Sequence, residues 1–461
     1  MKSENKISVL NITSSILLKG IAFFTTPIIS RMLGTAQYGL YSLFQFRLEI
    51  ISCVIGLGLV SSIGTAIHEY NEDYQEYRSS SLLLTTLSSL GFIIIANIFI
   101  RPISVMFNYD IRIVEYILFL ALFYVIVNYA QTVFIYEKKA EHNFVMSLLL
   151  SIITVVLSIY IIPRLEKSNK YLGMVYGQMI SYGIVAVIVW LMIFIKKPTR
   201  IKKEYTLYGL TYGIPVVFHL LSHSVLSQSD REMMDRMGVS KHELGVYSLF
   251  FALTSVLSVI VTALSNSLTP FYLEGIKGEK WNDLDIKCKN IFEVFTVCIV
   301  GFLMLSREVS LFISSEEFWE GQNIIPLLTI SIFFIFLYQF PVCYEFYYKK
   351  TRVVAIATAI CAVVNILLNL IMIPLWGMYG AGFTTAISYL LLFLIHYIFV
   401  VRMSKGKYHL KIYSCIPWFI IILISSACFY IFAKLIILRW CIAVLVGMIE
   451  LYRIVKRKSI F

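Results

Sequence analysis

Charge is scarce in this chain of 461 residues: only 14% of its side chains are Asp, Glu, Lys or Arg, against about a quarter in soluble domains. Hydrophobic side chains make up 59%. Apolar runs of about 20 residues recur from end to end, and each is long enough to cross a hydrocarbon core as a helix. The lack of charge argues against a soluble domain and predicts an all-α polytopic membrane protein.

Metal, redox and nucleotide motifs are missing as well. The eight cysteines mostly fall within apolar runs, with no CxxC pair and no interleaved histidines, so they indicate buried free thiols. The chain has no P-loop motif, which argues against ATP hydrolysis. The first apolar run, from Val9, is too long for a signal-peptide core and lacks a cleavage site. We therefore expect no cofactor, no metal site and no enzymatic activity.

The apolar runs divide into about fourteen predicted transmembrane helices, joined by loops of about fifteen residues or fewer. They cover roughly 9–32, 38–66, 79–102, 112–136, 143–163, 171–195, 206–228, 244–270, 287–312, 322–347, 352–373, 377–401, 412–433 and 436–453.

The net charge of +12 reflects membrane topology rather than nucleic-acid binding. With the N-terminus in the cytoplasm, 25 of the 39 Lys and Arg residues fall in inside segments and 12 in outside segments; Lys19 and Arg47 lie within spans. Such an excess marks the cytoplasmic side and attracts anionic lipid. We predict a multi-pass protein of the cell inner (cytoplasmic) membrane with both termini in the cytoplasm and no nucleic-acid partner.

An internal duplication is visible at a spacing of about 206 residues. A glycine-led hexapeptide occurs twice, and each of two Lys-Lys pairs lies 25 residues before a proline. The matched landmarks are Gly39–Phe44 with Gly245–Phe250, Lys138-Lys139 with Lys349-Lys350, and Pro163 with Pro374. Two repeated helical halves are typical of secondary transporters, whose substrate site lies between the halves.

The densest basic loop, Lys196–Lys203, separates the sixth span from the seventh. Six spans per half give both halves the same orientation, so the repeat is parallel with a pseudo-twofold axis along the membrane normal. We predict an N-terminal six-helix lobe at 1–200 and a C-terminal six-helix lobe at 201–403 around a central cavity. Residues 404–461 would add two transmembrane helices and a basic cytoplasmic tail.

Charged residues inside spans are the sharpest candidates for function. Each costs roughly 2.5–3.5 kcal/mol at mid-span, so it usually faces a partner or a wet cavity. Lys19 lies in the first span, and Arg47 and Glu49 lie in the second. Leu253 and Ser255 stand at the equivalent places of Arg47 and Glu49 in the second half. The scaffold therefore does not require these charges; the alternative is a structural ion pair of Arg47 with Glu49 or another carboxylate.

The seventh span adds polar candidates. His219 and His223 lie four residues apart on one helical face, which fits a wet, cavity-facing stripe better than a metal site without a third ligand. Asp230 and Arg231 at its outer end form either part of the site or a structural cap. Asn369, in the eleventh span, is a weaker candidate because buried Asn also joins helices.

Several segments resemble the polysaccharide-exporter family, bacterial flippases of lipid-linked O-antigen and capsule units. Their superfamily also holds multidrug-and-toxin extrusion transporters. The resemblance covers the first twelve spans well and the last two loosely. It rests on Pro27, Arg31, Leu33-Gly34, Tyr38–Tyr41, Tyr212–Pro215, Ser229–Arg231, Gly245–Ser248 and Asn365–Gly382.

The resemblance implies a two-lobed bundle whose cavity opens alternately to each side. It implies that a polyprenyl-diphosphate-linked oligosaccharide moves from the cytoplasmic to the outer leaflet, with a polysaccharide polymerase and chain-length proteins as partners besides the lipid bilayer. Cations in the cavity would bind the diphosphate. The expected substrate-binding residues are Arg47, Lys19, Glu49, His219, His223, Asp230, Arg231 and Asn369.

Other functions stay open at this point. A multidrug extruder driven by Na⁺ or H⁺ needs a carboxylate-rich site, whereas the clear intramembrane acid of the first half, Glu49, lies beside Arg47. A membrane glycan polymerase or acyltransferase is less compatible with the short outer loops. A flippase of the lipid II type is a further relative.

The charge bias predicts where reporter fusions will be active. Alkaline phosphatase fused at Lys202 or at Lys458 should be inactive, because both sites are expected in the cytoplasm. An active fusion at either site would overturn the orientation.

Overall fold

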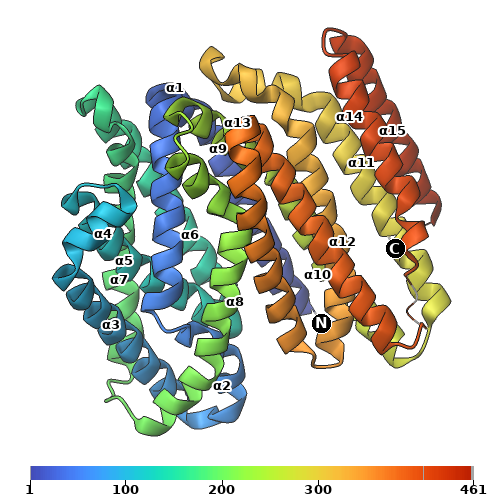
Figure 1. The fold of residues 1–461 in the computed structure, drawn as a ribbon. Helices are drawn as coiled ribbons and strands as arrows, with labels where there is room; N and C mark the ends of the chain where they lie inside the picture. Colours follow the sequence, from blue (N-terminus) through green and yellow to red (C-terminus); the bar gives the residue numbers. More distant parts are fainter. Residues whose placement is uncertain (1, 407, 409, 458–461) are drawn as a thin grey trace. The chain divides into compact units, whose positions relative to one another are not determined.

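The computed structural model describes the backbone of residues 2–406, 408 and 410–457, and the side chains of this part from residue 25 onward. Within this part the chain is helical and contains no β-strand (Figure 1). The α-helices are α1 (Lys2–Ile55), α2 (Ile63–Glu69), α3 (Tyr74–Ile98), α4 (Ile100–Phe107), α5 (Ile111–Tyr136), α6 (Ala140–Ile161), α7 (Tyr171–Lys196), α8 (Lys203–Arg236), α9 (Lys241–Thr254), α10 (Val256–Lys277), α11 (Trp281–Ile313), α12 (Ile325–Tyr347), α13 (Thr351–Met403), α14 (Ile416–Ile431) and α15 (Ile436–Arg457). Short 3-10 helices are η1 (Leu59–Ser62), η2 (Asn71–Asp73), η3 (Ile162–Arg164), η4 (Lys167–Asn169), η5 (Glu316–Ile324) and η6 (Ile412–Ser414).

The prediction of an all-α polytopic membrane protein is confirmed. Ten helices of the described part are long and apolar enough to cross a membrane, or eleven if one bent pair is a single span. The 53-residue helix α13 contains two predicted spans, 352–373 and 377–401, joined across a kink at Gly377. Helix α15 is not among the ten; it carries five charged residues, Arg439, Glu450, Arg453, Lys456 and Arg457.

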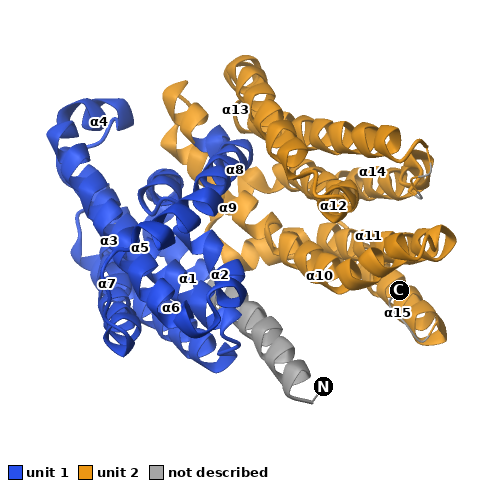
Figure 2. Cartoon of the chain, turned by 90° about the horizontal axis from the view of Figure 1, so that it is seen from below, with its two compact units in different colours: residues 1–231 blue, residues 232–461 orange. Residues whose placement is uncertain are grey.

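The chain forms two compact units, residues 1–231 and 232–461 (Figure 2). The boundary between them falls within α8. In unit 1 the core is built from α1, α3, α5, α6 and α7, whose apolar side chains pack together. Unit 2 contains the two C-terminal helices α14 and α15, which pack on α11. The predicted division at 200/201 and 403/404 stays a prediction.

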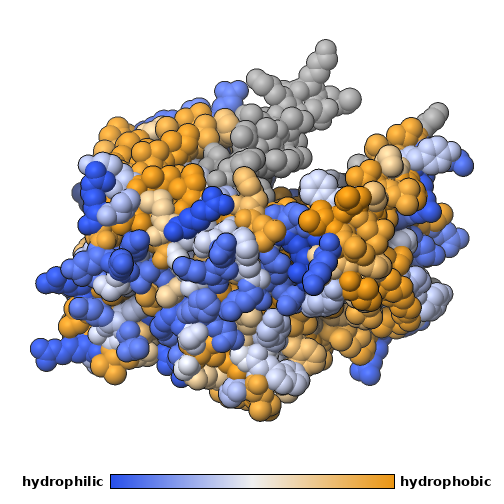
Figure 3. All heavy atoms as spheres, turned by 90° about the horizontal axis from the view of Figure 1, so that it is seen from above, coloured by the Kyte–Doolittle hydropathy of each residue, from blue (hydrophilic) through white to orange (hydrophobic). Residues whose placement is uncertain are grey.

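Large apolar side chains cover much of the outer surface. Val105 is 81% exposed in α4, Phe218 is 67% exposed in α8, and Ile437 is 80% exposed in α15. Figure 3 shows wide hydrophobic areas on one face of the molecule, beside areas of hydrophilic residues. In a membrane protein such areas face lipid, so the helices need no polar partner there.

The second span was predicted as one continuous helix over 38–66, and this is wrong because the helix breaks in the middle. Helix α1 ends at Ile55, and the chain resumes as η1 and α2 after a bend of 59°. Gly58 has a φ of +63°, which L-residues rarely adopt, and a Cβ there would overlap the carbonyl of Gly213 in α8. The break therefore combines a left-handed turn with a close approach between backbones, which hydropathy does not report.

The two Lys-Lys pairs make the same turn in both units. Lys138 and Lys349 have φ values of +58° and +56°. The next amide, of Lys139 or Lys350, donates to the carbonyl five residues back at 2.8 Å in each case. This is the hydrogen bond that closes a helix ending in a left-handed residue. The shared geometry supports the duplication inferred from sequence.

A second matched contact holds the start of a later helix in each unit. In unit 1, the side chain of Gln37 accepts a hydrogen bond from the amide of Tyr171, which begins α7, at 3.1 Å. In unit 2, Glu243 accepts one from the amide of Met378, directly after the α13 kink, at 2.7 Å. Gln37 and Glu243 are separated by 206 residues, the same spacing as Gly39 and Gly245. Each side chain thus satisfies a helix-start amide that has no partner within its own helix.

The kink at Gly377 should not tolerate a side chain. Its φ is +52°, and a Cβ there would overlap Oε1 of Glu243, the acceptor of the Met378 amide. We expect Gly377→Ala to lower the free energy of unfolding by about 2 kcal/mol or more, measured as a lower Tm in detergent. Gly301→Ala is the matched control, because a Cβ at Gly301 meets nothing within 4 Å. Equal Tm values for the two variants would contradict this explanation of the kink.

Candidate functional site

Arg47 lies inside unit 1 and is only 2% exposed. Its guanidinium carbon sits 4.2 Å from the ring centre of Tyr109 and 5.3 Å from that of Phe107. Both rings belong to the end of α4 and the link to α5. A guanidinium over aromatic faces at this distance is a favourable cation–π contact. In this conformation the two rings cover the guanidinium of Arg47.

Glu49 is held by α8 rather than by Arg47. Its Oε1 accepts a hydrogen bond from the hydroxyl of Ser224 at 2.6 Å, and its Oε2 accepts one from the side-chain amide of Gln228. Gln228 in turn accepts a hydrogen bond from Nη1 of Arg231 at 2.6 Å. The result is a polar chain that joins α1 to α8 within unit 1, in which a carboxylate is stabilised by neutral donors.

A cavity of about 180 Å³ opens beside this polar chain. Its wall includes Glu49 with the hydroxyls of Ser52, Thr85 and Tyr124 and the amide of Asn128. Apolar residues and the glycines at the break after α1 complete it. The hydroxyl and amide groups of this wall both donate and accept hydrogen bonds, so they suit the hydroxyl groups of a ligand, although the cavity is smaller than the roughly 300–1,000 Å³ of typical small-molecule sites.

Arg47 and Glu49 lie on α1, as does Lys19. The remaining predicted residues of unit 1 lie on α8. His219 is half-buried and His223 is exposed. Asp230 and Arg231 are 2% and 7% exposed, and the Arg231 amide donates to Oδ1 of Asp230 at 2.8 Å. The side chain of Lys19 lies outside the described part. Of the residues predicted in unit 1, the structure joins Glu49 and Arg231 in one network, through Gln228.

Asn369 belongs to a separate polar cluster in unit 2. It is fully buried, donates to Oδ1 of Asn365 at 3.0 Å, and accepts a hydrogen bond from Thr384. Asn365 donates to the hydroxyl of Ser388 at 3.1 Å. These bonds join the two limbs of α13 across its kink, so the contacts of Asn369 are those of a residue that holds helices together.

A buried acid–base pair also lies in unit 2. Nδ1 of His396 in α13 is 2.9 and 3.0 Å from the two carboxylate oxygens of Glu345 in α12, and both side chains are fully buried. The ring of Tyr338 stacks near His396 with 6.3 Å between centres. The sequence analysis did not identify this pair, because His396 and Glu345 lie 51 residues apart in the chain.

The basic loop before α8 is tied to the start of α3. Nζ of Lys202 lies 2.7 Å from the carboxylate of Glu76, which also accepts a hydrogen bond from Thr199 at 3.0 Å. The hydrogen bond to Glu76 raises the pKa of Lys202 above its ordinary value. Lys202 therefore stays positively charged at neutral pH, as the charge-bias interpretation of this loop requires.

Sequence reasoning missed Ser224 and Gln228. A signal was available, because residues 224, 228 and 231 are spaced by four and three and so share one helical face. Hydropathy ranks Ser and Gln as ordinary polar residues of a helix. Only the approach of Glu49 from α1 shows that both are partners of a carboxylate.

A polytopic helical fold with buried polar networks is typical of membrane transporters, in which ionisable groups within spans often mark substrate paths. Comparison with known families shows the family of this chain. The family described as polysaccharide biosynthesis protein matches residues 6–274, more than half of the chain. The chain belongs to this family.

Curated relatives share low identity over most of their length. "Lsg locus putative protein 1" of Haemophilus influenzae is 22% identical over 377 residues, which cover 78% of this chain and 89% of that protein. An "uncharacterized membrane protein" of the same organism is 22% identical over 363 residues, covering 75% of this chain and 84% of that one.

Solved structures with this fold are transporters. The lipid II flippase MurJ in an inward closed conformation matches with a TM-score of 0.71 and 15% identity, over 96% of this chain and 98% of that one. An inward-facing multidrug resistance transporter of the MATE family and MOP superfamily matches with a TM-score of 0.66 and 14% identity, over 84% and 95%. A MOP superfamily transporter from Pyrococcus furiosus, described as having a binding pocket of reverse polarity, matches with a TM-score of 0.60 and 15% identity, over 87% and 96%.

The polar chain between α1 and α8 makes a stability prediction. Gln228→Leu should lower the free energy of unfolding by about 2 kcal/mol, because Glu49 and Arg231 each lose a hydrogen bond in a partly buried site. Thr211→Val is the control on the same helix, since the Thr211 hydroxyl donates to the carbonyl of Leu207 in its own helix. Thermal unfolding in detergent should separate the two variants; similar Tm values would show that the network contributes little.

Proposed function

We propose that this protein is a flippase for polyprenyl-diphosphate-linked oligosaccharide units, such as those of O-antigen, capsule or a related surface polysaccharide. It moves them from the cytoplasmic to the outer leaflet of the inner membrane by alternating access, with both termini in the cytoplasm. Membership of the polysaccharide biosynthesis family supports the substrate class. A polysaccharide polymerase and chain-length proteins would use the delivered units.

The observation that carries this proposal is the polar chain Glu49–Ser224–Gln228–Arg231 with its adjoining cavity. Its wall offers hydroxyl, amide and carboxylate groups, which match the many hydroxyls of a sugar. The expected substrate-binding residues remain those named from the sequence. Among them, Glu49 lines the cavity, and Arg231 is linked to Glu49 through Gln228.

Arg47 and Lys19 are proposed to bind the diphosphate. A guanidinium can hold phosphate oxygens through two parallel hydrogen bonds, and an ammonium adds a point charge. The aromatic rings over Arg47 cover it in this conformation. Binding would therefore accompany a movement of the link between α4 and α5, as expected of a transporter that alternates between states.

The second candidate function is a cation-coupled multidrug and toxin extruder. Its basis is the fold shared with the MATE transporter. A site for organic cations needs a carboxylate that is available to the ligand. Glu49 is the single carboxylate among the described residues that line this cavity, and Gln228 links it to the cation Arg231, which favours the glycan substrate over an organic cation.

Two serines of α8 provide a matched test of the glycan site. Ser224→Ala removes a donor to Glu49, whereas the hydroxyl of Ser222 bonds to the carbonyl of Phe218 in its own helix. We expect Ser224→Ala to reduce surface glycan assembly about tenfold at equal membrane level, since loss of a hydrogen bond to a charged group costs roughly 1.5 kcal/mol. Ser222→Ala should behave like the wild type. Equal activities, or export of cationic dyes in place of glycan assembly, would contradict the proposal.

Substitutions of Arg47 distinguish a role in binding substrate from a role in holding the fold together. If it binds the diphosphate, Arg47→Ala should leave the membrane level nearly unchanged and stop surface glycan assembly, with polyprenyl-linked units accumulating inside. Arg47→Lys should retain part of the activity, because the charge remains and the bidentate geometry is lost. Immunoblots and analysis of lipid-linked sugars measure both quantities. A proportional fall of abundance and assembly would make Arg47 a structural residue and remove it from the site.

A further inference from the structure

A cavity of about 340 Å³ lies among α11, α14 and α15, in unit 2 and apart from the network of Glu49. Its wall is almost entirely apolar, formed by side chains such as Val300, Ile421 and Val446. Its volume falls within the range of about 300–1,000 Å³ typical of small-molecule sites. Two of its polar residues, Thr296 and Glu450, have no hydrogen-bond partner among the residues that the structure describes.

Glu450 is the unusual member of this wall. It is 4% exposed, and neither carboxylate oxygen has a hydrogen-bond partner within the described part of the chain. Thr296, on the facing helix α11, is 2% exposed, and its hydroxyl also lacks a partner among the described residues. A buried carboxylate without a partner is costly, so it either binds a proton or meets a ligand that donates hydrogen bonds.

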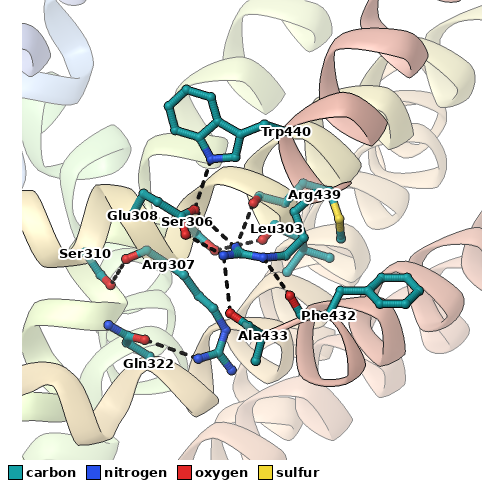
Figure 4. Close-up of polar contacts among 11 residues, drawn as sticks. Leu303, Ser306, Arg307, Glu308, Ser310, Gln322, Phe432, Ala433, Arg439 and Trp440 are labelled. Carbon is teal, nitrogen blue, oxygen red and sulfur yellow. Dashed lines mark hydrogen bonds and ion pairs between the residues drawn. The ribbon is translucent and has the colours of Figure 1, made fainter. Parts of the chain in front are cut away.

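Two ion-pair clusters fix α15 against α11 on either side of this cavity. At one end Arg439, fully buried, pairs with Glu308 and donates to the carbonyls of Met304 and Phe432 at 3.0 Å each. Figure 4 shows the Arg439 guanidinium enclosed by Glu308 and by the backbone that joins α14 to α15. At the other end, Arg453 and Arg457 pair with Glu293. The cavity is thus held open between two fixed ends rather than formed by a loose helix.

The charges at the second end complement a zwitterion. Glu450 and Arg453 are three residues apart and therefore share a face of α15. The side chain of Arg453 is 52% exposed, and its pairing with Glu293 involves one of five guanidinium donors. Residues three apart on a helix are neighbours, so one headgroup can place its ammonium at Glu450 and its phosphate at Arg453, and the apolar wall would take an acyl chain.

We propose that this cavity is a binding site for a phospholipid with a primary amine headgroup, of the phosphatidylethanolamine type. The ammonium donates hydrogen bonds to Glu450 and the Thr296 hydroxyl accepts one, while the phosphate meets Arg453. A choline headgroup has no N–H to donate, and a glycerol headgroup brings no positive charge. The site therefore discriminates between lipids by headgroup, and it is independent of the transported substrate.

The test uses the full-length protein in nanodiscs that contain equal amounts of phosphatidylethanolamine and phosphatidylcholine with identical chains. Lipids retained through detergent extraction are then quantified by mass spectrometry. We expect ethanolamine lipid to be enriched about tenfold over choline lipid, the ratio for one hydrogen-bonded charge pair. Glu450→Gln should remove the enrichment. Glu316→Gln is the control, because Glu316 is exposed in η5 and away from the cavity.

A second measurement covers the case in which Glu450→Gln does not fold. The Tm of the wild type should be higher in ethanolamine than in choline nanodiscs, and Thr296→Val should reduce that difference. Absence of any headgroup preference in the wild type would overturn the proposal and leave Glu450 as a buried protonated acid. An enrichment that persists in both Glu450→Gln and Thr296→Val would also overturn it, because the preferred lipid would then bind elsewhere.

Discussion

The need to satisfy polar groups in apolar surroundings shapes this protein more than any single contact. A helix satisfies its own interior amides and carbonyls, but each break exposes amides that need another partner. Gln37 and Glu243 supply that partner at the start of α7 and after the kink of α13. Their acceptor side chains lie 206 residues apart, the spacing of the duplication inferred from sequence.

The polar residues that depart from the repeat are the ones that suggest function. Glu49 has Ser255 as its counterpart, and Arg47 has Leu253. The carboxylate of Glu49 is supported from α8 through Ser224 and Gln228. The second half folds without charges at these two places, so we propose that Arg47 and Glu49 handle a polar cargo in addition to any contribution that the Glu49 network makes to stability.

Composition and repeated motifs predicted the architecture well, because long apolar runs and turn residues act locally. The Lys138 and Lys349 turns could be matched from sequence for this reason. The break at Gly58 could not, because it depends on the backbone of Gly213 approaching from α8. Two members of the polar chain, Glu49 and Arg231, were named from the sequence, while Gln228, which links them, was identified only from the structure.

Helix α15 shows the same contrast between local features, which the sequence reveals, and contacts between distant residues, which only the fold reveals. The sequence predicts a final span at 436–453, whereas the five charged residues of α15 leave it outside the helices apolar enough to span a membrane. The partners of Arg439 and Arg453 are Glu308 and Glu293 of α11, more than 130 residues earlier, so only the fold shows that most of this charge is paired. Glu450 lacks such a partner in the described part, which is why it draws attention as a site.

The most direct test of the central claim is translocation by the purified protein. Proteoliposomes would carry a polyprenyl-diphosphate oligosaccharide in one leaflet, and a membrane-impermeant glycosidase would report its arrival in the other. We predict protein-dependent exposure of the glycan that Ser224→Ala slows and Ser222→Ala does not. Exposure at the rate of protein-free liposomes, with transport of organic cations in the same vesicles, would contradict the flippase assignment.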